Sequence, residues 1–106
     1  MKIKLAKNEL IHLIGIGGIG MSSLALIMMK QGFKIQGSDI NYNKNIAILK
    51  KNQIKCFLDQ KKQNIKNATI IIISSAIKQN NPELIEAKKK IFRYLKEVKC
   101  WGMFCP

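Results

Sequence analysis

The chain has 106 residues, a net charge of +13 and a hydrophobic content of 47%. This length is that of one domain, and the hydrophobic content excludes a disordered tail. The positive charge comes from lysine, because Arg93 is the only arginine. Specific nucleic-acid readers depend on arginine for bidentate contacts. Lysine also accompanies abundant Ile and Asn, which share AT-rich codons, so a compositional bias explains the charge and we expect no nucleic-acid partner.

The cysteines are Cys56, Cys100 and Cys105, and they form no C-x-x-C pair. Their odd number and their spacing argue against a disulfide framework and against a zinc site. Reduced thiols are typical of a cytoplasmic protein, which is the location we expect.

An uncharged stretch, 10–29, is long enough to span a bilayer. Its centre, from Gly15 to Gly20, reads G-I-G-G-I-G and would form a poor continuous helix. We therefore expect a strand, a turn and a helix in this stretch, and no membrane partner.

Hydrophobic periodicity and turn residues divide the chain into alternating elements. In chain order we expect a strand at 10–15, a helix at 19–31, strands at 33–37 and 54–58 on either side of a helix at 43–52, and a strand at 68–74. Consecutive isoleucines at 70–73 suit a buried central strand. A last helix opens at Asn81-Pro82-Glu83, which supplies an N-cap, a first-turn proline and an acid. This order predicts a single α/β domain with a Rossmann-like, doubly wound parallel sheet.

The glycine turn Gly15-x-Gly17-x-x-Gly20 falls between a predicted strand and a predicted helix. In such turns the first glycine allows a sharp bend, the second lets a phosphate approach the backbone, and the third permits close packing of helix on strand. The extra Gly18 frees the loop further. Free N–H groups at the helix N-terminus then favour an anion. The alternative is a tight turn that binds nothing.

Two further groups of polar residues end predicted strands at the same edge of the sheet. Asp39 follows the second strand, where a carboxylate accepts from a ribose hydroxyl pair or a uracil N–H. Ser74 and Ser75 follow the isoleucine strand and can donate to a diphosphate or sugar; alternatively they form only a turn. These positions predict a nucleotide diphosphate at the switch point of the sheet, without deciding between a dinucleotide and a nucleotide sugar.

His12 lies within the first predicted strand. No acid or nucleophile is placed beside it in the sequence, so we interpret it as a core histidine and not as a catalytic base. No catalytic constellation is visible, and we expect neither catalytic residues nor a metal site in this chain.

Four strings occur in a characteristic order: H-L-I-G-I-G-G-I-G-M-S from His12, G-S-D from Gly37, S-S-A-I-K from Ser74 and N-P-E-L from Asn81. Together they resemble the N-terminal domain of the Mur ligase family, in particular of its UDP-N-acetylmuramate–L-alanine ligases. The resemblance extends over about 10–90.

The resemblance implies a domain that binds the UDP part of UDP-N-acetylmuramate within a ligase that adds L-alanine during the synthesis of peptidoglycan precursors. The full-length family uses ATP and Mg²⁺ through an acyl-phosphate, with its ATP phosphate site in a second domain. Carried over, the substrate-binding residues would be Gly15, Gly17, Gly18, Ile19, Gly20, Met21, Ser22, Ser38, Asp39, Ser74, Ser75, Ala76 and Ile77.

The chain departs from the family pattern in two places. Where relatives commonly show Ile-Gly-His, with the histidine near the uridine, the chain has Leu58-Asp59-Gln60. It also contains no G-x-x-x-x-G-K-[ST] string for ATP phosphates. We therefore expect a UDP-sugar-binding domain at 1–95 and an aberrant tail at 96–106 that follows a frameshift, with the missing ligase domains encoded downstream. We also expect no cofactor and no activity of the chain alone.

The expectations for the tail are structural. Residues 91–95 alternate and could pair as a further strand, whereas 96–106 carry no continuous apolar stripe for an amphipathic helix. Two other functions stay open: a stand-alone NAD(P)-binding Rossmann module, and a remnant that binds nothing.

Overall fold

The computed structural model describes residues 9–95, so the expectations for 96–106 lie outside the described residues. Its sheet has four strands, all parallel, in the order β3-β2-β1-β4. The elements follow one another as β1 (Leu10–Ile14), α1 (Ile19–Lys30), β2 (Lys34–Ser38), α2 (Lys44–Lys51), β3 (Lys55–Phe57), η1 (a 3₁₀ helix, Lys62–Ile65), β4 (Ile70–Ile73) and α3 (Pro82–Leu95). The predicted α/β fold with a parallel sheet is confirmed.

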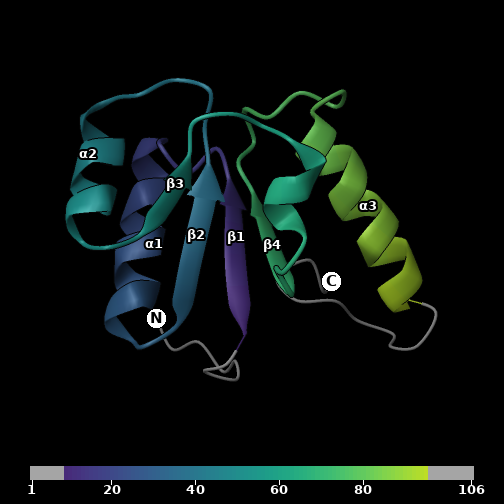
Figure 1. The fold of residues 1–106 in the computed structure, drawn as a ribbon, viewed down its shortest axis with the longest axis horizontal. Helices are drawn as coiled ribbons and strands as arrows, with labels where there is room; N and C mark the ends of the chain where they lie inside the picture. Colours follow the sequence, from purple (N-terminus) through teal and green to yellow (C-terminus); the bar gives the residue numbers. More distant parts are fainter. Residues whose placement is uncertain (1–8, 96–106) are drawn as a thin grey trace.

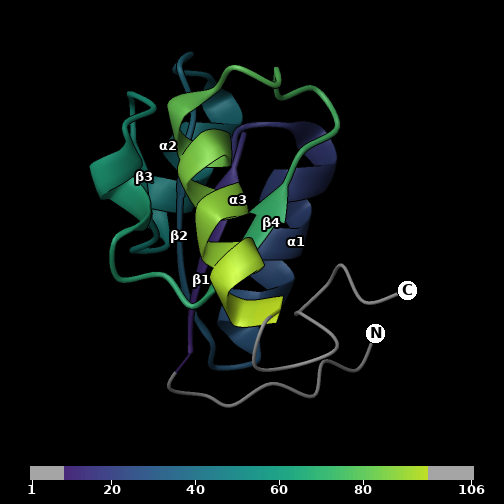
Figure 2. The same ribbon diagram turned by 90° about the vertical axis from the view of Figure 1, so that its right-hand side faces the viewer.

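The helices form a layer on each face of the sheet. Figure 1 shows α1 and α2 on one side, with η1 and α3 on the other. In Figure 2, turned by 90°, α3 lies across the front of the sheet and α1 lies behind it. This arrangement gives two separate apolar cores.

The alternation of side chains along β1 divides its residues between these two cores. Ile11 and Leu13 point into the core beneath α1 and α2, whereas Ile14 packs on the α3 side with Ile71 of β4. The same alternation sends His12 to the α3 side, where a polar cluster replaces apolar packing. The α3 face is therefore the one on which the sheet carries buried polar groups.

The first helix buries a different stripe from the one its apolar residues suggest. Leu24, Ile27 and Met28 recur at helical spacing, but the side chain of Ile27 is 45% exposed. The buried residues are Ser22, Ala25 and Met28, because the small residues at the first two positions let the helix approach the sheet.

Residues 91–95 are helical, which corrects the expectation that they could pair as a strand. Leu84, Ala87, Ile91 and Leu95 recur at intervals of three and four residues, the spacing of one helix face. Because no glycine or proline interrupts this pattern after Pro82, the helix runs on through the stretch that reads locally as alternating.

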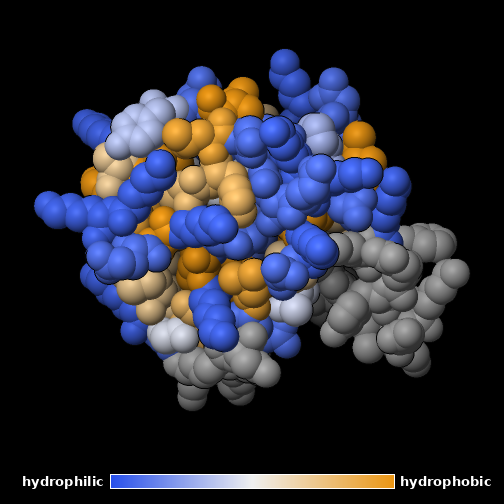
Figure 3. Space-filling view, viewed as in Figure 1, coloured by the Kyte–Doolittle hydropathy of each residue, from blue (hydrophilic) through white to orange (hydrophobic). Residues whose placement is uncertain are grey.

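The stretch 10–29 forms a strand, a turn and a helix, as predicted. None of the helices within 9–95 has the length and apolar character needed to cross a membrane. Figure 3 shows polar side chains spread over the face viewed there, with smaller apolar patches between them.

Two glycines have roles that their place in the turn motif does not suggest. The expectation that Gly20 permits close packing is wrong, because a Cβ on Gly20 would have nothing within 4 Å. The close approach lies at Gly37 of β2, where a Cβ would sit 2.6 Å from the carbonyl oxygen of Leu13 and 2.5 Å from Cδ1 of Ile16. The chain after β1 therefore crosses directly over Gly37.

We predict that Gly37→Ala lowers the free energy of unfolding by about 1–3 kcal/mol, the usual cost of overpacking, because backbone must shift to admit the methyl group. Gly20→Ala is the matched control, and it should leave stability unchanged or raise it, since alanine favours a helix. Urea unfolding of both variants measures the difference. Equal stability of the two would show that Ile16 can move aside without cost.

Candidate ligand-binding pocket

A pocket of about 480 Å³ lies at the carboxyl ends of β1, β2 and β4. This is the edge where ligands bind in open parallel sheets. Three segments form its walls: the glycine turn with the end of β2, the segment between β3 and η1, and the loop from β4 into α3. The lining residues are Gly15, Gly18, Asp39, Ile40, Asn41, Gln60, Ser74, Ala76, Ile77, Lys78, Asn80, Asn81 and Pro82.

The turn after β1 is bent at Gly15, whose φ of +85° favours glycine. A Cβ there would also lie 3.0 Å from Cβ of Ser74, so the turn packs directly against the end of β4. Gly15 and Ile16 both donate their N–H groups to the carbonyl oxygen of Ser38, which ties the turn to β2. The first glycine therefore has the bending role predicted for it.

Gly17 faces protein atoms and not the open pocket. Its N–H donates to Oδ2 of Asp39 at 3.0 Å, and a Cβ would lie 2.8 Å from the same oxygen. Its carbonyl oxygen accepts from the side-chain amides of Asn43 and Asn45 at the start of α2. Gly17 therefore lacks a side chain because the Asp39 carboxylate lies where a Cβ would be. The sequence pattern predicts a phosphate of the ligand in this space instead.

The N-terminus of α1 lies beside the turn. Within the described residues, the N–H groups of Ile19, Gly20 and Met21 have no acceptor, whereas Ser22 donates to the carbonyl oxygen of Gly18. Such unpaired N–H groups and the helix dipole favour an anion at this end of the helix.

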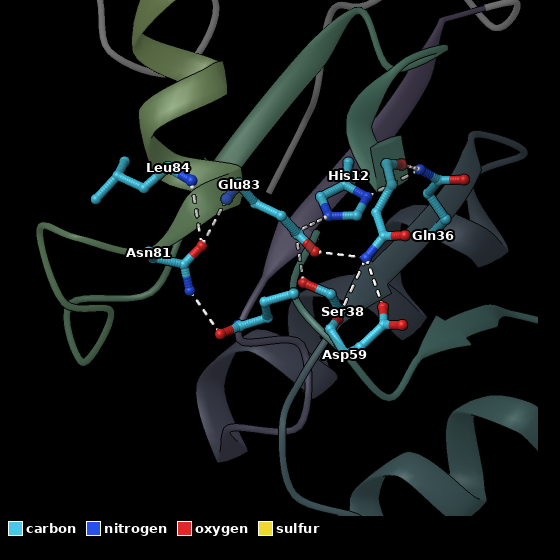
Figure 4. A network of polar contacts seen from close by, with 9 residues as sticks. His12, Gln36, Ser38, Asp59, Asn81, Glu83 and Leu84 are labelled. Atoms are coloured by element: carbon cyan, nitrogen blue, oxygen red, sulfur yellow. Dashed lines mark hydrogen bonds and ion pairs between the residues drawn. The ribbon is translucent and has the colours of Figure 1, made fainter. Parts of the chain in front are cut away.

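The carboxylate of Glu83, in the first turn of α3, is fully buried and belongs to a network of polar contacts (Figure 4). Its Oε1 contacts Nε2 of His12 at 2.7 Å and accepts from Oγ of Ser38 at 2.6 Å. Its Oε2 accepts from Nδ2 of Asn64 at 2.7 Å. One side chain therefore joins α3 to β1, to β2 and to η1.

The hydrogen bonds around His12 define which ring nitrogen carries its proton. Nε2 of Gln36 contacts the carbonyl oxygen of Asn64, which can only accept, so this atom is the amide nitrogen. The same nitrogen lies 2.8 Å from Nδ1 of His12, which must therefore accept as well. The proton of His12 then resides on Nε2 and points to Glu83, so the arrangement contains a neutral imidazole and a carboxylate.

The expectation that His12 is a core residue is confirmed, since its side chain is fully buried. The reason given for it is wrong, because an acid does lie beside the ring. Glu83 is 71 positions away in the sequence, and the contact exists only once α3 covers the sheet. The register pairs His12 with Gln36 and Ile14 with Ser38, so the polar residues of β1 and β2 lie on one face of the sheet. Their alternation with apolar residues is visible in the sequence and could have indicated this polar face.

The predicted binding residues divide into two groups. One group lines the pocket and consists of Gly15, Gly18, Asp39, Ser74, Ala76 and Ile77. Ser38 is fully buried and committed to Glu83, while Oγ of Ser22 donates to the carbonyl oxygen of Ile19 within its own helix. The remaining predicted residues, which do not line the pocket, are Gly17, Ile19, Gly20, Met21 and Ser75.

Sequence reasoning missed Asn41, Asn80, Asn81 and Lys78 as pocket residues. All of them lie in the loops that follow β2 and β4, where no hydrophobic pattern sets a position. In residues 9–95 no group of His, Cys, Asp and Glu side chains could hold a metal ion. Cys56 is half-buried, and burial raises the pKa of its thiol, which makes it a poor nucleophile at neutral pH.

A parallel sheet with helices on both faces, and a glycine turn at the carboxyl ends of its strands, defines a doubly wound α/β domain. The sequence of residues 10–103 matches the Mur ligase family, catalytic domain. The chain belongs to the Mur ligase family.

Curated relatives are named UDP-N-acetylmuramate–L-alanine ligase. One from Pelagibacter ubique is 66% identical over 85% of this chain, and one from Rickettsia prowazekii is 55% identical over 76% of it. A solved UDP-N-acetylmuramate–alanine ligase from Thermotoga maritima superposes with a TM-score of 0.72 at 30% identity, over 84% of this chain and 22% of that one. The chain spans 19% of the Pelagibacter protein and 16% of the Rickettsia protein.

We predict that Glu83→Gln destabilises the chain by about 1–3 kcal/mol, the cost of a buried donor without an acceptor. The new amide nitrogen would face Nδ2 of Asn64, which is also a donor. Asn64 cannot reverse its amide to offer an oxygen instead, because Nδ2 would then lose its hydrogen bonds to the carbonyl oxygen and to Oδ1 of Asp59. Glu86→Gln, on the same helix and partly exposed, is the control. Urea unfolding that gives both variants the same stability would mean that the three donors do not require a carboxylate.

Proposed function

We propose that the pocket binds the UDP part of UDP-N-acetylmuramate, as the first domain of a ligase that adds L-alanine to that nucleotide sugar in the cytoplasm. One observation supports this most: the glycine turn, the acid after β2 and the S-S-A-I-K segment, which are distant in sequence, line the same pocket. The names of the relatives supply the class of substrate.

The diphosphate would lie beside the glycine turn. There the free N–H groups at the start of α1 supply donors, and the helix dipole favours negative charge. Lys78 lines the pocket from the loop after β4 and is the lysine in its wall. A cation at this point offsets the charge of the Asp39 carboxylate, which would otherwise oppose a diphosphate.

Asp39 is held for a role in recognising hydroxyl or imide groups. Its Oδ2 accepts from the N–H of Gly17 and its Oδ1 from the N–H of Asn41, so the carboxylate keeps one orientation. Each oxygen has a second lone pair available for a ribose hydroxyl or a uracil N–H. Fixing an acceptor in advance reduces the entropy lost on binding.

The ATP chemistry of the ligase is assigned to parts of the enzyme other than this domain. A phosphoryl transfer site needs a phosphate cradle and metal ligands. The sequence contains no G-x-x-x-x-G-K-[ST] string, and residues 9–95 contain no metal cluster. The residues present do not fit ATP with Mg²⁺, so we derive no catalytic step from them.

Calorimetric titration of the purified chain with UDP-N-acetylmuramate tests the proposal, with NADH as the parallel ligand. We expect heat of binding with the UDP-sugar and none with NADH. Binding of NADH alone would support a dinucleotide module, and the absence of heat with either ligand would support a chain that binds no nucleotide. Both results contradict the proposal.

We predict that Lys78→Ala lowers the affinity for UDP-N-acetylmuramate about tenfold, which corresponds to the ~1.4 kcal/mol expected of a partly screened charged contact. Because Lys78 is exposed, the melting temperature should not change. Lys62→Ala, an exposed lysine of η1 outside the pocket, is the control. An affinity unchanged by Lys78→Ala, or lowered equally by both substitutions, would place the diphosphate elsewhere.

We also expect that the 106-residue chain neither ligates L-alanine nor hydrolyses ATP. Phosphate release is measured with UDP-N-acetylmuramate, L-alanine, ATP and Mg²⁺ present together. Turnover above that of a buffer blank, and lost in Gly17→Val, would contradict this. In that variant the Cβ would displace Asp39 and press on Ile46 of α2, so we expect lower stability as well as weaker binding.

A further inference from the structure

Gln60 lies in the pocket wall between β3 and η1, and one hydrogen bond holds its side chain. Nδ2 of Asn81 donates to Oε1 of Gln60 at 2.5 Å. Within the described residues no acceptor contacts Nε2 of Gln60, and the side chain is partly exposed in the pocket. The oxygen of this amide therefore accepts a hydrogen bond, whereas its nitrogen has no partner within the described residues.

The start of α3 determines which end is open. Oδ1 of Asn81 accepts from the backbone N–H groups of Glu83 at 2.9 Å and Leu84 at 3.2 Å (Figure 4). Backbone N–H groups can only donate, so the amide of Asn81 cannot be reversed. Its nitrogen must face Gln60, which requires the oxygen of Gln60 to face Asn81. The free group of Gln60 is thus its NH₂, a donor and never an acceptor.

The backbone next to Gln60 is held as well. Asn64 donates to the carbonyl oxygen and to Oδ1 of Asp59, and the same nitrogen donates to Oε2 of Glu83. Gln60 is therefore anchored through its neighbour Asp59 to the buried carboxylate, and through its own side chain to Asn81. Glu83 lies in the first turn of α3 and Asn81 directly precedes that helix, so the start of α3 places the donor.

We propose that Gln60 is a specificity-determining residue, which donates a hydrogen bond from Nε2 to an acceptor oxygen of the bound nucleotide. The proposal rests on the proposed function, because it concerns the same pocket. Acceptor oxygens of a uridine nucleotide occur in the carbonyl groups of the base and in the phosphates. A fixed donor can pair with either kind of oxygen, and it disfavours a ligand that presents an amino group at the same point. Asn81 is the positioning residue for this contact.

The decisive variant is Gln60→Glu, which keeps the shape of the side chain and the oxygen that Asn81 needs, but presents an oxygen to the pocket instead of a donor. Gln63→Glu makes the same change of charge at an exposed position of η1 outside the pocket. Gln60→Met removes the donor without introducing repulsion. Calorimetry of the four proteins with UDP and with CDP at neutral pH, together with their melting temperatures, gives the comparison.

We expect Gln60→Glu to lower the affinity for UDP at least tenfold, Gln60→Met to lower it less, and Gln63→Glu to leave it within twofold of the unchanged chain. If the acceptor is the base carbonyl that is replaced by an amino group in cytosine, Gln60→Glu will lose less affinity for CDP than for UDP. If the acceptor is a phosphate oxygen, or the base carbonyl that uracil and cytosine share, it will lose affinity for both equally. Either result supports the proposal.

Equal affinities of the unchanged chain and Gln60→Glu would overturn the inference while leaving the proposed function intact. Failure of the unchanged chain to bind any uridine nucleotide would instead contradict the proposed function. An affinity of Gln60→Met equal to that of the unchanged chain would show that the side chain fills space without donating, and would also overturn the inference. Melting temperatures within a few degrees confirm that the comparison is between folded proteins.

Discussion

The carboxylate of Glu83 accepts hydrogen bonds from β1, β2 and η1 while it lies in the first turn of α3. Burial of an uncompensated charge costs several kcal/mol, so this group requires all its partners. The position in the first turn adds the favourable field of the helix N-terminus. Since removal of the carboxylate would leave all three donors without an acceptor, this side chain holds the four elements together as a unit.

The pocket depends on this unit because a short chain of hydrogen bonds connects each of its walls to Glu83. Ser38 donates to the carboxylate and accepts, through its carbonyl oxygen, from the glycine turn. Asn64 carries the connection to Asp59 and thus to the segment that contains Gln60. Asn81 begins the helix that carries Glu83. The buried polar cluster therefore links the geometry of the pocket to the docking of α3.

Much of the fold could be predicted from the sequence, because the information is local. The isoleucines of β4, the glycine at the bend after β1 and the cap at Asn81 each determine their surroundings within a few residues. The polar cluster could not be predicted in the same way. His12 and Glu83 are far apart in the sequence, and only the packing of α3 on the sheet brings them together. The role of Gly37 is hidden for the same reason, since the chain that crosses it comes from the turn after β1.

The state of the His12 ring tests the central claim most directly, because the cluster allows only one arrangement of its protons. Nitrogen-15 NMR of the folded chain at neutral pH distinguishes the two nitrogens of an imidazole. The account predicts a neutral ring with its proton on Nε2 and an unprotonated Nδ1 that accepts from Gln36. A proton on Nδ1, whether the ring is neutral or charged, would contradict it, because the amide of Gln36 could not then donate both to the ring and to the carbonyl oxygen of Asn64.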